Sequence, residues 1–321
     1  MLAQLLCLGR HTITSLITTY GAQFADWTAH YDLYAKQRVD PNVLFKGIRE
    51  NIEQINGNHE PLTIALDDTI LRKTGQFIPG AAYRKDPLGP AFNINLVWAQ
   101  RMIQFSACIP GANGEGRMVP INFVDASTPR KMRTIQIKTI ERARWRKAGE
   151  MDLRLVVIRA IPRKGPRGNR AYSQPAYLIC TDPSLALGDL LQSYIWRWDI
   201  EVNHRDEKTL LGVGEAQVRN PESAWSVPAS AVAAYAMLQL AAIRAFGWDG
   251  KPNVIPPPQW RDPEKKRRAS TLDLVNELRR ELWADAIHNM NLTDFKNGKS
   301  PDAKSVKYQP NLGSALFTAT A

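Results

Sequence analysis

Residues 62–68 read LTIALDD, residues 91–100 read AFNINLVWAQ, and residues 102–110 read MIQFSACIP. Each run is short, apolar and rich in β-branched and aromatic residues, and turns containing Gly or Pro separate the runs, so the pattern predicts β-strands. Four more runs of this kind follow: VPINFVDAS, TIQIKTIERARW, DLRLVVIRAIP and AYLICTD, at residues 119–127, 134–145, 152–162 and 176–182.

Helical patterns come before these strands. Residues 1–58 predict short helices, with Thr12 and Asp40 as N-caps and Gly21 and Gly57 as stop signals. Short helices around a tight turn are compatible with a helix-turn-helix motif that binds DNA, and also with an ordinary three-helix cluster. Both alternatives stay open.

Helical patterns also follow the strands. Residues 185–212 and 223–247 are predicted helices, and the second is apolar almost all round, as a buried helix would be. Residues 254–268 form a proline-rich basic linker, and residues 270–288 predict a final amphipathic helix capped by Ser270. Helices, then strands, then helices predict a mixed α/β (α+β) fold.

The chain carries a formal net charge of +11 over 321 residues. Its basic residues cluster in residues 130–147 and 162–170. Such runs are often only solvated faces, but two of them in a basic protein indicate a polyanionic partner, and DNA is the first candidate.

The cysteines and the apolar runs bear on the compartment. Cys7, Cys108 and Cys180 form neither a disulfide framework nor a CxxC pair, so we expect buried free thiols in a reducing cytoplasm. No uninterrupted apolar run reaches the ~18 residues that span a bilayer, so no membrane association is expected. The apolar start of the chain lacks a basic leader, so we expect no signal peptide.

Residues 194–208 read YIWRWDIEVNHRDEK, which combines aromatic and charged residues without Gly or Pro. On one helix, Tyr194, Arg197, Glu201 and Lys208 share a polar stripe, and His204 lies beside it. The neighbouring apolar stripe is expected to pack on the sheet; its members are Leu191, Ile195, Trp198 and Val202. By helix physics alone, Arg197 and Glu201 could be a simple i,i+4 ion pair.

The spacing Tyr-x2-Arg-x3-Glu-x6-Lys matches at all four positions the signature of one group of bacterial insertion-sequence transposases. These are DDE enzymes with a ribonuclease H-like fold, which cut DNA at the element's ends and join it to a target. The resemblance implies that Glu201 is a metal-binding carboxylate. It also implies that Tyr194, Arg197 and Lys208 contact phosphates of the element's end.

A second stretch, TIALDDTILRKTG at residues 63–75, resembles the first-strand motif of the same family. The resemblance implies that Asp68, next to Asp67, is the first catalytic aspartate and a metal ligand. The apolar run should also end where these acids begin, which would place a carboxylate at the sheet's carboxyl edge. The alternative is a solvated turn at the end of a strand. Residues 81–101, 176–184 and 207–221 also resemble family segments, so the likeness covers most of the chain.

The chemistry of such enzymes needs about three carboxylates around two divalent ions, and hard oxygen ligands suit Mg²⁺ or Mn²⁺. The family's middle aspartate, expected before a long β-rich insertion, is not recognisable here. Asp125 and Asp182 both end strand-like runs, and we take Asp125 as the first substitute and Asp182 as the second. We expect that a segment is missing near Arg133, so that catalysis is severely weakened or lost. No zinc or nucleotide motif occurs.

Two smaller signals remain. Trp196 could stack on an unpaired base, whereas Trp198 is expected in the core. His204 is expected at the surface or on a phosphate rather than on a metal.

These patterns predict a helical region at 1–58 that could bind DNA and a ribonuclease H-like core at 59–250, with an insertion at about 128–182. A basic linker and C-terminal helix follow at 251–321. The expected function is DNA transposition, and the resemblance adds a homodimer acting on two DNA ends. The alternative is a non-catalytic DNA-binding remnant. A metal-dependent nuclease or small-molecule hydrolase that uses Asp68 and Glu201 explains less of the signature.

Overall fold

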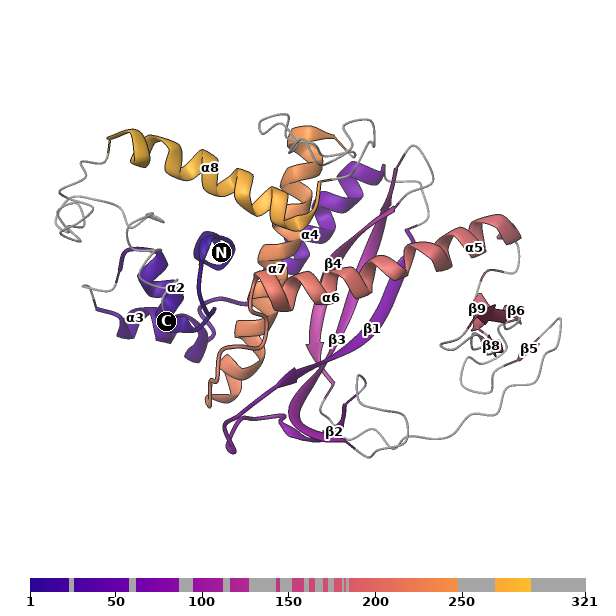
Figure 1. Cartoon of the computed structure of the whole chain (residues 1–321), viewed down its shortest axis with the longest axis horizontal. Coiled ribbons are helices and arrows are strands. Elements are labelled where there is room, and N and C mark those ends of the chain that lie inside the picture. Colours follow the sequence, from indigo (N-terminus) through magenta and orange to yellow (C-terminus); the bar gives the residue numbers. More distant parts are fainter. Residues whose placement is uncertain are drawn as a thin grey trace. The chain divides into compact units, whose positions relative to one another are not determined.

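A computed structural model of the chain describes residues 1–22, 26–57, 62–86, 95–111, 116–126, 143–144, 152–158, 162–164, 170–172, 176–180, 182, 185–247 and 269–289. The chain divides into two compact units (Figure 1). The first consists of Met1–Pro129 with Asp199–Ala321, and the second is Arg130–Trp198. The described part is mixed α/β with a small antiparallel sheet. The predicted boundaries near residues 58 and 250 lie outside the described residues.

Four helices begin the first unit: α1 (Leu2–Leu6), α2 (Ile13–Thr19), α3 (Thr28–Ala35) and α4 (Pro41–Asn56). The predicted caps are confirmed, because Thr12 accepts a hydrogen bond from the Ser15 amide and Asp40 accepts one from the Asn42 amide. Gly21 and Gly57 adopt positive φ angles just after α2 and α4. Helix α3 was not predicted, and none of its residues is buried.

The sheet of the first unit contains β1 (Ile64–Arg72), β2 (Ala82–Lys85), β3 (Leu96–Pro110) and β4 (Gly116–Asp125). Strand β3 pairs with the other three strands, and every pairing is antiparallel. The prediction that the first strand ends at Asp67 was wrong, because the β1–β3 ladder continues to the pair Arg72 and Ala99. The two runs predicted around Arg101 are likewise one long strand.

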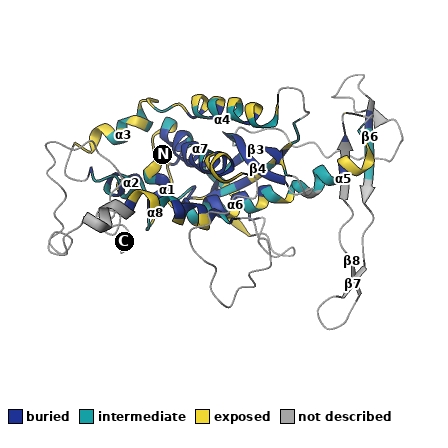
Figure 2. Ribbon diagram, turned by 90° about the horizontal axis from the view of Figure 1, so that it is seen from above, coloured by how far each residue is buried: buried dark blue, intermediate teal, exposed yellow. Residues whose placement is uncertain are grey.

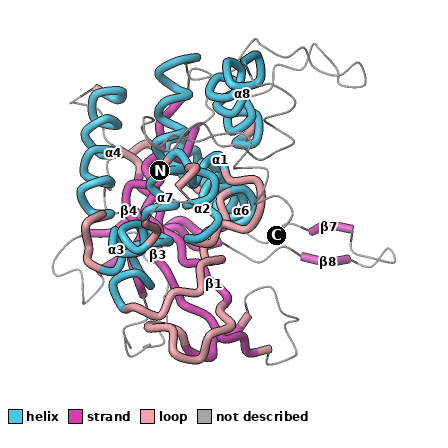
Figure 3. Tube along the Cα trace, turned by 90° about the vertical axis from the view of Figure 1, so that its left-hand side faces the viewer, coloured by secondary structure: helices cyan, strands magenta, loops and turns pink. Residues whose placement is uncertain are grey.

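Helix α7 (Pro221–Phe246) contacts β4 and α4, and its buried side chains form the centre of the core (Figure 2). The prediction of a buried helix is therefore confirmed. By length and composition alone α7 could also cross a membrane, but 89% of its most apolar window is buried inside the protein. Helix α1 packs against α2 and α7 (Figure 3).

The segment around the transposase-like signature forms two helices, α5 (Leu187–Trp196) and α6 (Trp198–Leu210), rather than the single helix expected. Arg197 lies in a turn between them, although its amide still donates to the Ser193 carbonyl at 3.2 Å. The last described helix is α8 (Thr271–Asn289). Its predicted cap is confirmed, since Ser270 and Asp273 exchange backbone-to-side-chain hydrogen bonds.

The second unit contains short antiparallel strands besides α5. Strand β6 (Asp152–Ile158) pairs with β5 (Ala143–Arg144) and with β9 (Ala176–Cys180). Strands β7 (Pro162–Lys164) and β8 (Arg170–Tyr172) pair with each other. Most of the basic run at residues 130–147, including the site near Arg133 where we expect a missing segment, lies outside the described residues.

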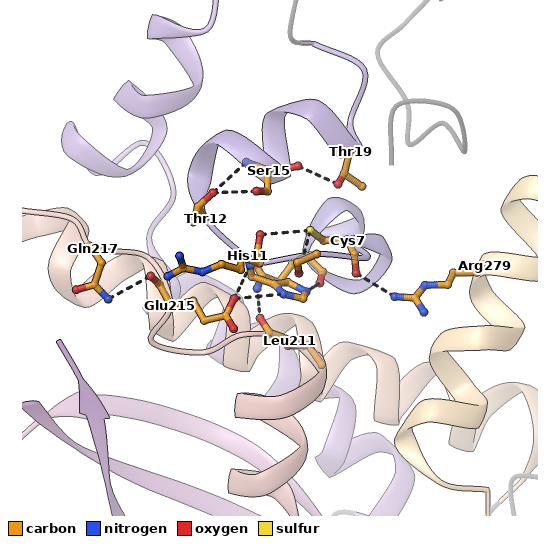
Figure 4. A network of polar contacts seen from close by, with 12 residues as sticks. Cys7, His11, Thr12, Ser15, Thr19, Leu211, Glu215, Gln217 and Arg279 are labelled. Atoms are coloured by element: carbon orange, nitrogen blue, oxygen red, sulfur yellow. Dashed lines mark hydrogen bonds and ion pairs between the residues drawn. The ribbon is translucent and has the colours of Figure 1, made fainter. Parts of the chain in front are cut away.

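The loop that follows α6, residues 211–217, is held from two sides. From the N-terminal region, Gln4 of α1 donates to the Leu211 carbonyl. The amide of His11, which lies between α1 and α2, donates to the Glu215 carboxylate (Figure 4). From the end of β1, the Lys73 ammonium donates to the carbonyls of Gly214 at 2.9 Å and Ala216 at 3.0 Å. These contacts fix the exit of α6.

Lys73 should make the stability of the first unit depend on pH. Burial lowers the pKa of its ammonium to about 8. Below this pKa both the folded and the unfolded chain are protonated, and folding carries the full cost of burying the charge. Between pH 8 and 10.5 only the unfolded chain keeps the proton, so stability should rise with pH, by up to ~3 kcal/mol.

Urea denaturation at pH 7.5 and pH 10 measures this effect. The wild type should gain stability relative to Lys73→Met as the pH rises. Lys46→Met removes an exposed lysine of α4 and should follow the wild type. Parallel behaviour of the wild type and Lys73→Met would contradict the prediction.

Candidate functional site

The first-strand motif and the α6 part of the signature segment meet in space within the first unit. Asp67 of β1 lies with Oδ2 4.0 Å from Nε2 of His204 on α6. Along β1 the side chains alternate, and Asp67 shares the buried face with Ala65, Thr69 and Leu71. Motifs far apart in the sequence therefore pack against each other.

Asp68 lies on the opposite face of β1. Its Oδ2 accepts a hydrogen bond from Nε of Arg101 on β3 at 2.7 Å, and its side chain is 43% exposed. This hydrogen bond raises the pKa of the Arg101 guanidinium. The expectation that Asp68 stands at the end of a strand was wrong, because Asp68 pairs with Ile103 in mid-strand. Of the two adjacent acids, Asp67 faces α6 and Asp68 does not.

Glu201 and Lys208 lie at opposite ends of α6. Glu201 is exposed in the first turn, where its negative charge suits the helix dipole. Burial lowers the pKa of the Lys208 ammonium, and the charges of Glu207, Arg72, Asp86 and Glu201 also act on it. Lys208 is half-buried, so its charge is partly desolvated.

Near Lys208 is an ion pair that the sequence analysis missed. Arg72 at the end of β1 donates to Asp86 at 2.6 Å, and Asp86 is buried. Arg72 ends β1 and Asp86 directly follows β2, and both strands pair with β3. Only this register brings them together, so no local sequence signal reveals the pair.

The remaining predicted residues are divided between the units. Tyr194, Trp196 and Arg197 belong to the second unit and are half-buried, and Asp182 is exposed there. Asp125 ends β4 in the first unit as predicted, and it pairs with Met102. Because directly opposite residues share a face and neighbours alternate, Asp125 lies on the face of Asp67 rather than that of Asp68.

This arrangement does not fit the predicted pair of divalent ions. Carboxylate oxygens are suitable donors for Mg²⁺, but Asp68 points away from the face that carries Asp67 and already binds the Arg101 guanidinium. Within the described ranges no group of three His, Cys, Asp or Glu side chains is placed to hold a metal ion. We therefore derive no reaction step through a metal.

The buried face of α6 is polar, contrary to expectation. Trp198, predicted in the core, is 67% exposed, whereas His204, predicted at the surface, is only 7% exposed. Asn203 donates to the Met118 carbonyl at 2.8 Å and accepts a hydrogen bond from Tyr235 at 2.8 Å. Burial of the His204 ring argues against direct contact with a phosphate.

Two acidic groups of this buried face, Asp206 and Glu207, lie near the phenol of Tyr235 on α7. Asp206 accepts hydrogen bonds from Thr271 and from its neighbour Arg205. Burial, with the charge of Glu207 as a further cause, raises the pKa of the Tyr235 hydroxyl, which therefore stays protonated. The interior around α6 is thus rich in hydrogen-bonded polar groups, and periodicity of apolar residues could not reveal it.

Comparison with protein-family models gave no match, and comparison with curated proteins gave none. The fold and the site define a mixed α/β protein in which a half-buried aspartate of the sheet contacts a buried histidine of α6.

Proposed function

We propose that this chain is a DNA transposase of the DDE type that keeps DNA binding and has lost efficient strand cleavage. The observation that carries the proposal is the contact between Asp67 of the LDDT motif and His204 of the signature helix α6. The proposal requires the first strand and the helix that carries Glu201 to pack against each other, and this contact joins them. We propose such a core, in shortened form, for the first unit.

DNA binding is supported by charge. The net charge of +11 favours contact with phosphates, and these contacts release condensed counterions. Lys208 is the candidate phosphate contact in the first unit, and Tyr194 and Arg197 are the candidates in the second. Trp196 is the candidate for base stacking. A homodimer acting on two DNA ends, in the cytoplasm, belongs to the same proposal.

The loss of cleavage is supported by the positions of the carboxylates. Asp68 is neutralised by Arg101, and its neighbour Asp67 faces His204 on the other side of the sheet. Asp125 shares a face with Asp67, and no recognisable family segment supplies a better middle ligand. A fully active transposase remains the second candidate, because all four positions of the signature are present.

Binding and cleavage should be measured separately. The affinity for a DNA duplex should fall by at least ~100-fold between 50 and 200 mM salt if several phosphates are contacted. Lys208→Met should lower the slope of log affinity against log salt by about 1. Affinity that does not depend on salt would contradict the proposal and point to a small-molecule enzyme.

Cleavage is tested with Mn²⁺ or Mg²⁺ on duplexes that contain the DNA flanking the chain's own gene. We expect the wild type to cut no faster than Glu201→Ala. Metal-dependent cutting that disappears in Glu201→Ala would instead establish the active transposase, and Asp67→Asn, Asp68→Asn and Asp125→Asn would then identify its partners.

A further inference from the structure

His204 lies between two carboxylates in the interior of the first unit. Its Nε2 is 4.0 Å from Oδ2 of Asp67 on β1, and its Nδ1 is 3.5 Å from Oε2 of Glu207 on α6. The side chain of Glu207 is 1% exposed. Within the described residues, neither ring nitrogen makes a hydrogen bond, and Oε1 of Glu207 accepts no hydrogen bond. An ionised carboxylate buried in this position is stabilised by a nearby positive charge.

His204 is the group that can supply that charge on both sides. A neutral imidazole has one N–H donor and one lone pair, so its lone pair would face one of the two carboxylates. An imidazolium presents an N–H to each. Three other cations act in this part of the protein: Arg205 binds Asp206, Arg117 on β4 donates to Gln239, and the charge of Lys208 interacts with that of Glu207.

We propose that His204 is a positioning residue, a side chain shared by Asp67 and Glu207 that fixes α6 on β1 and so places Lys208 for contact with DNA. The pairing joins a strand to a helix, whereas the other contacts of the buried α6 face reach β4, α7 and the start of α8. It therefore determines how α6 lies on β1. The role of Lys208 in this inference rests on the proposed function, whereas the pairing itself does not.

The pairing is tested by removing the two charges separately and together. His204→Phe keeps the ring volume but removes the imidazole that lies between Asp67 and Glu207, and should lower the folding constant by ~10²–10³-fold. Adding Glu207→Gln to His204→Phe should raise the folding constant at least about tenfold again, although Glu207→Gln in the wild type should leave the folding constant unchanged or lower it. If Glu207→Gln is equally unfavourable in both backgrounds, His204 acts only by packing and the inference fails. If His204→Phe does not fold, His204→Gln serves in the same comparison.

The positioning role is tested by the salt dependence of DNA binding in folded protein. Lys208→Met should lower the log–log slope by about 1 in the wild type and by less than ~0.3 in the His204→Gln background. Lys46→Met on α4 is the control and should have the same effect in both backgrounds. Equal losses for Lys208→Met in both backgrounds would overturn the positioning role. No loss in the wild type would overturn the DNA contact at Lys208, while the folding measurements would still decide the pairing.

Discussion

Replacing Ile200 by Ala should lower the free energy of unfolding by ~3 kcal/mol, because this side chain of α6 is fully buried. Removing its outer carbons leaves a cavity that the surrounding helices and strands can fill only in part. Replacing Trp198 by Ala should change stability by less than ~0.5 kcal/mol, although Trp is much larger, because Trp198 is mostly exposed.

Urea denaturation of the two variants measures this difference directly. Comparing the two variants is informative because the sequence pattern predicts Trp198 in the core, whereas the structure places Ile200 there. A large loss of stability in Trp198→Ala, with little change in Ile200→Ala, would mean that the predicted apolar stripe faces the sheet and that α6 is rotated relative to the arrangement described above.

Replacing Gly212 by Ala should cost ~2–4 kcal/mol, because two separate effects act at this position. Gly212 has a φ of +59°, which side chains with a Cβ rarely adopt. In addition, an added Cβ would lie 2.5 Å from Cβ of His11, which is buried below the same loop. Either the loop or the start of α2 must then move.

Two other glycines separate these effects. Gly57 has a φ of +75° with nothing within 4 Å, so Gly57→Ala should cost only ~1 kcal/mol for the backbone. Gly47, inside α4, has open space and helical geometry, so Gly47→Ala should stabilise the protein by ~0.5–1 kcal/mol. Thermal or urea denaturation of the three variants should give this order. Equal costs at Gly212 and Gly57 would show that the contact with His11 relaxes freely.

The helices that were predicted correctly have local signals. Thr12, Asp40 and Ser270 accept or exchange hydrogen bonds with amides two or three residues away, so the cap and the helix are encoded in the same short segment. Helix α3 has no fully buried residue, and Trp27 at its N-cap makes no side-chain capping hydrogen bond, so the sequence pattern missed it. Helix α7 was recognised as buried because it is apolar on almost every side.

The strand boundaries were less predictable. The acidic pair Asp67–Asp68 looked like the end of a strand, but a continuous ladder with β3 keeps both residues in mid-strand. Arg101 on the neighbouring strand helps to explain how Asp68 can lie in mid-strand, because its guanidinium pairs with the Asp68 carboxylate. A single sequence does not show which residue will lie on the neighbouring strand. It therefore cannot predict that a charged residue within a strand will have an oppositely charged partner there.

The candidate site shows the same division. The sequence by itself determined which motifs are present: the acidic pair, the spacing of Glu201 and Lys208, and the strong positive charge. It also determined most of the helices, since caps and apolar periodicity act over a few residues. Only the tertiary structure decided that Asp67, and not Asp68, faces α6, and that His204 and Glu207 are buried while Trp198 is exposed. The physical reason is that a polar side chain can be buried only where another group compensates for its lost contact with water. For the polar side chains of α6, these groups come from β1, β4, α7 and the start of α8, which are distant from α6 in the sequence.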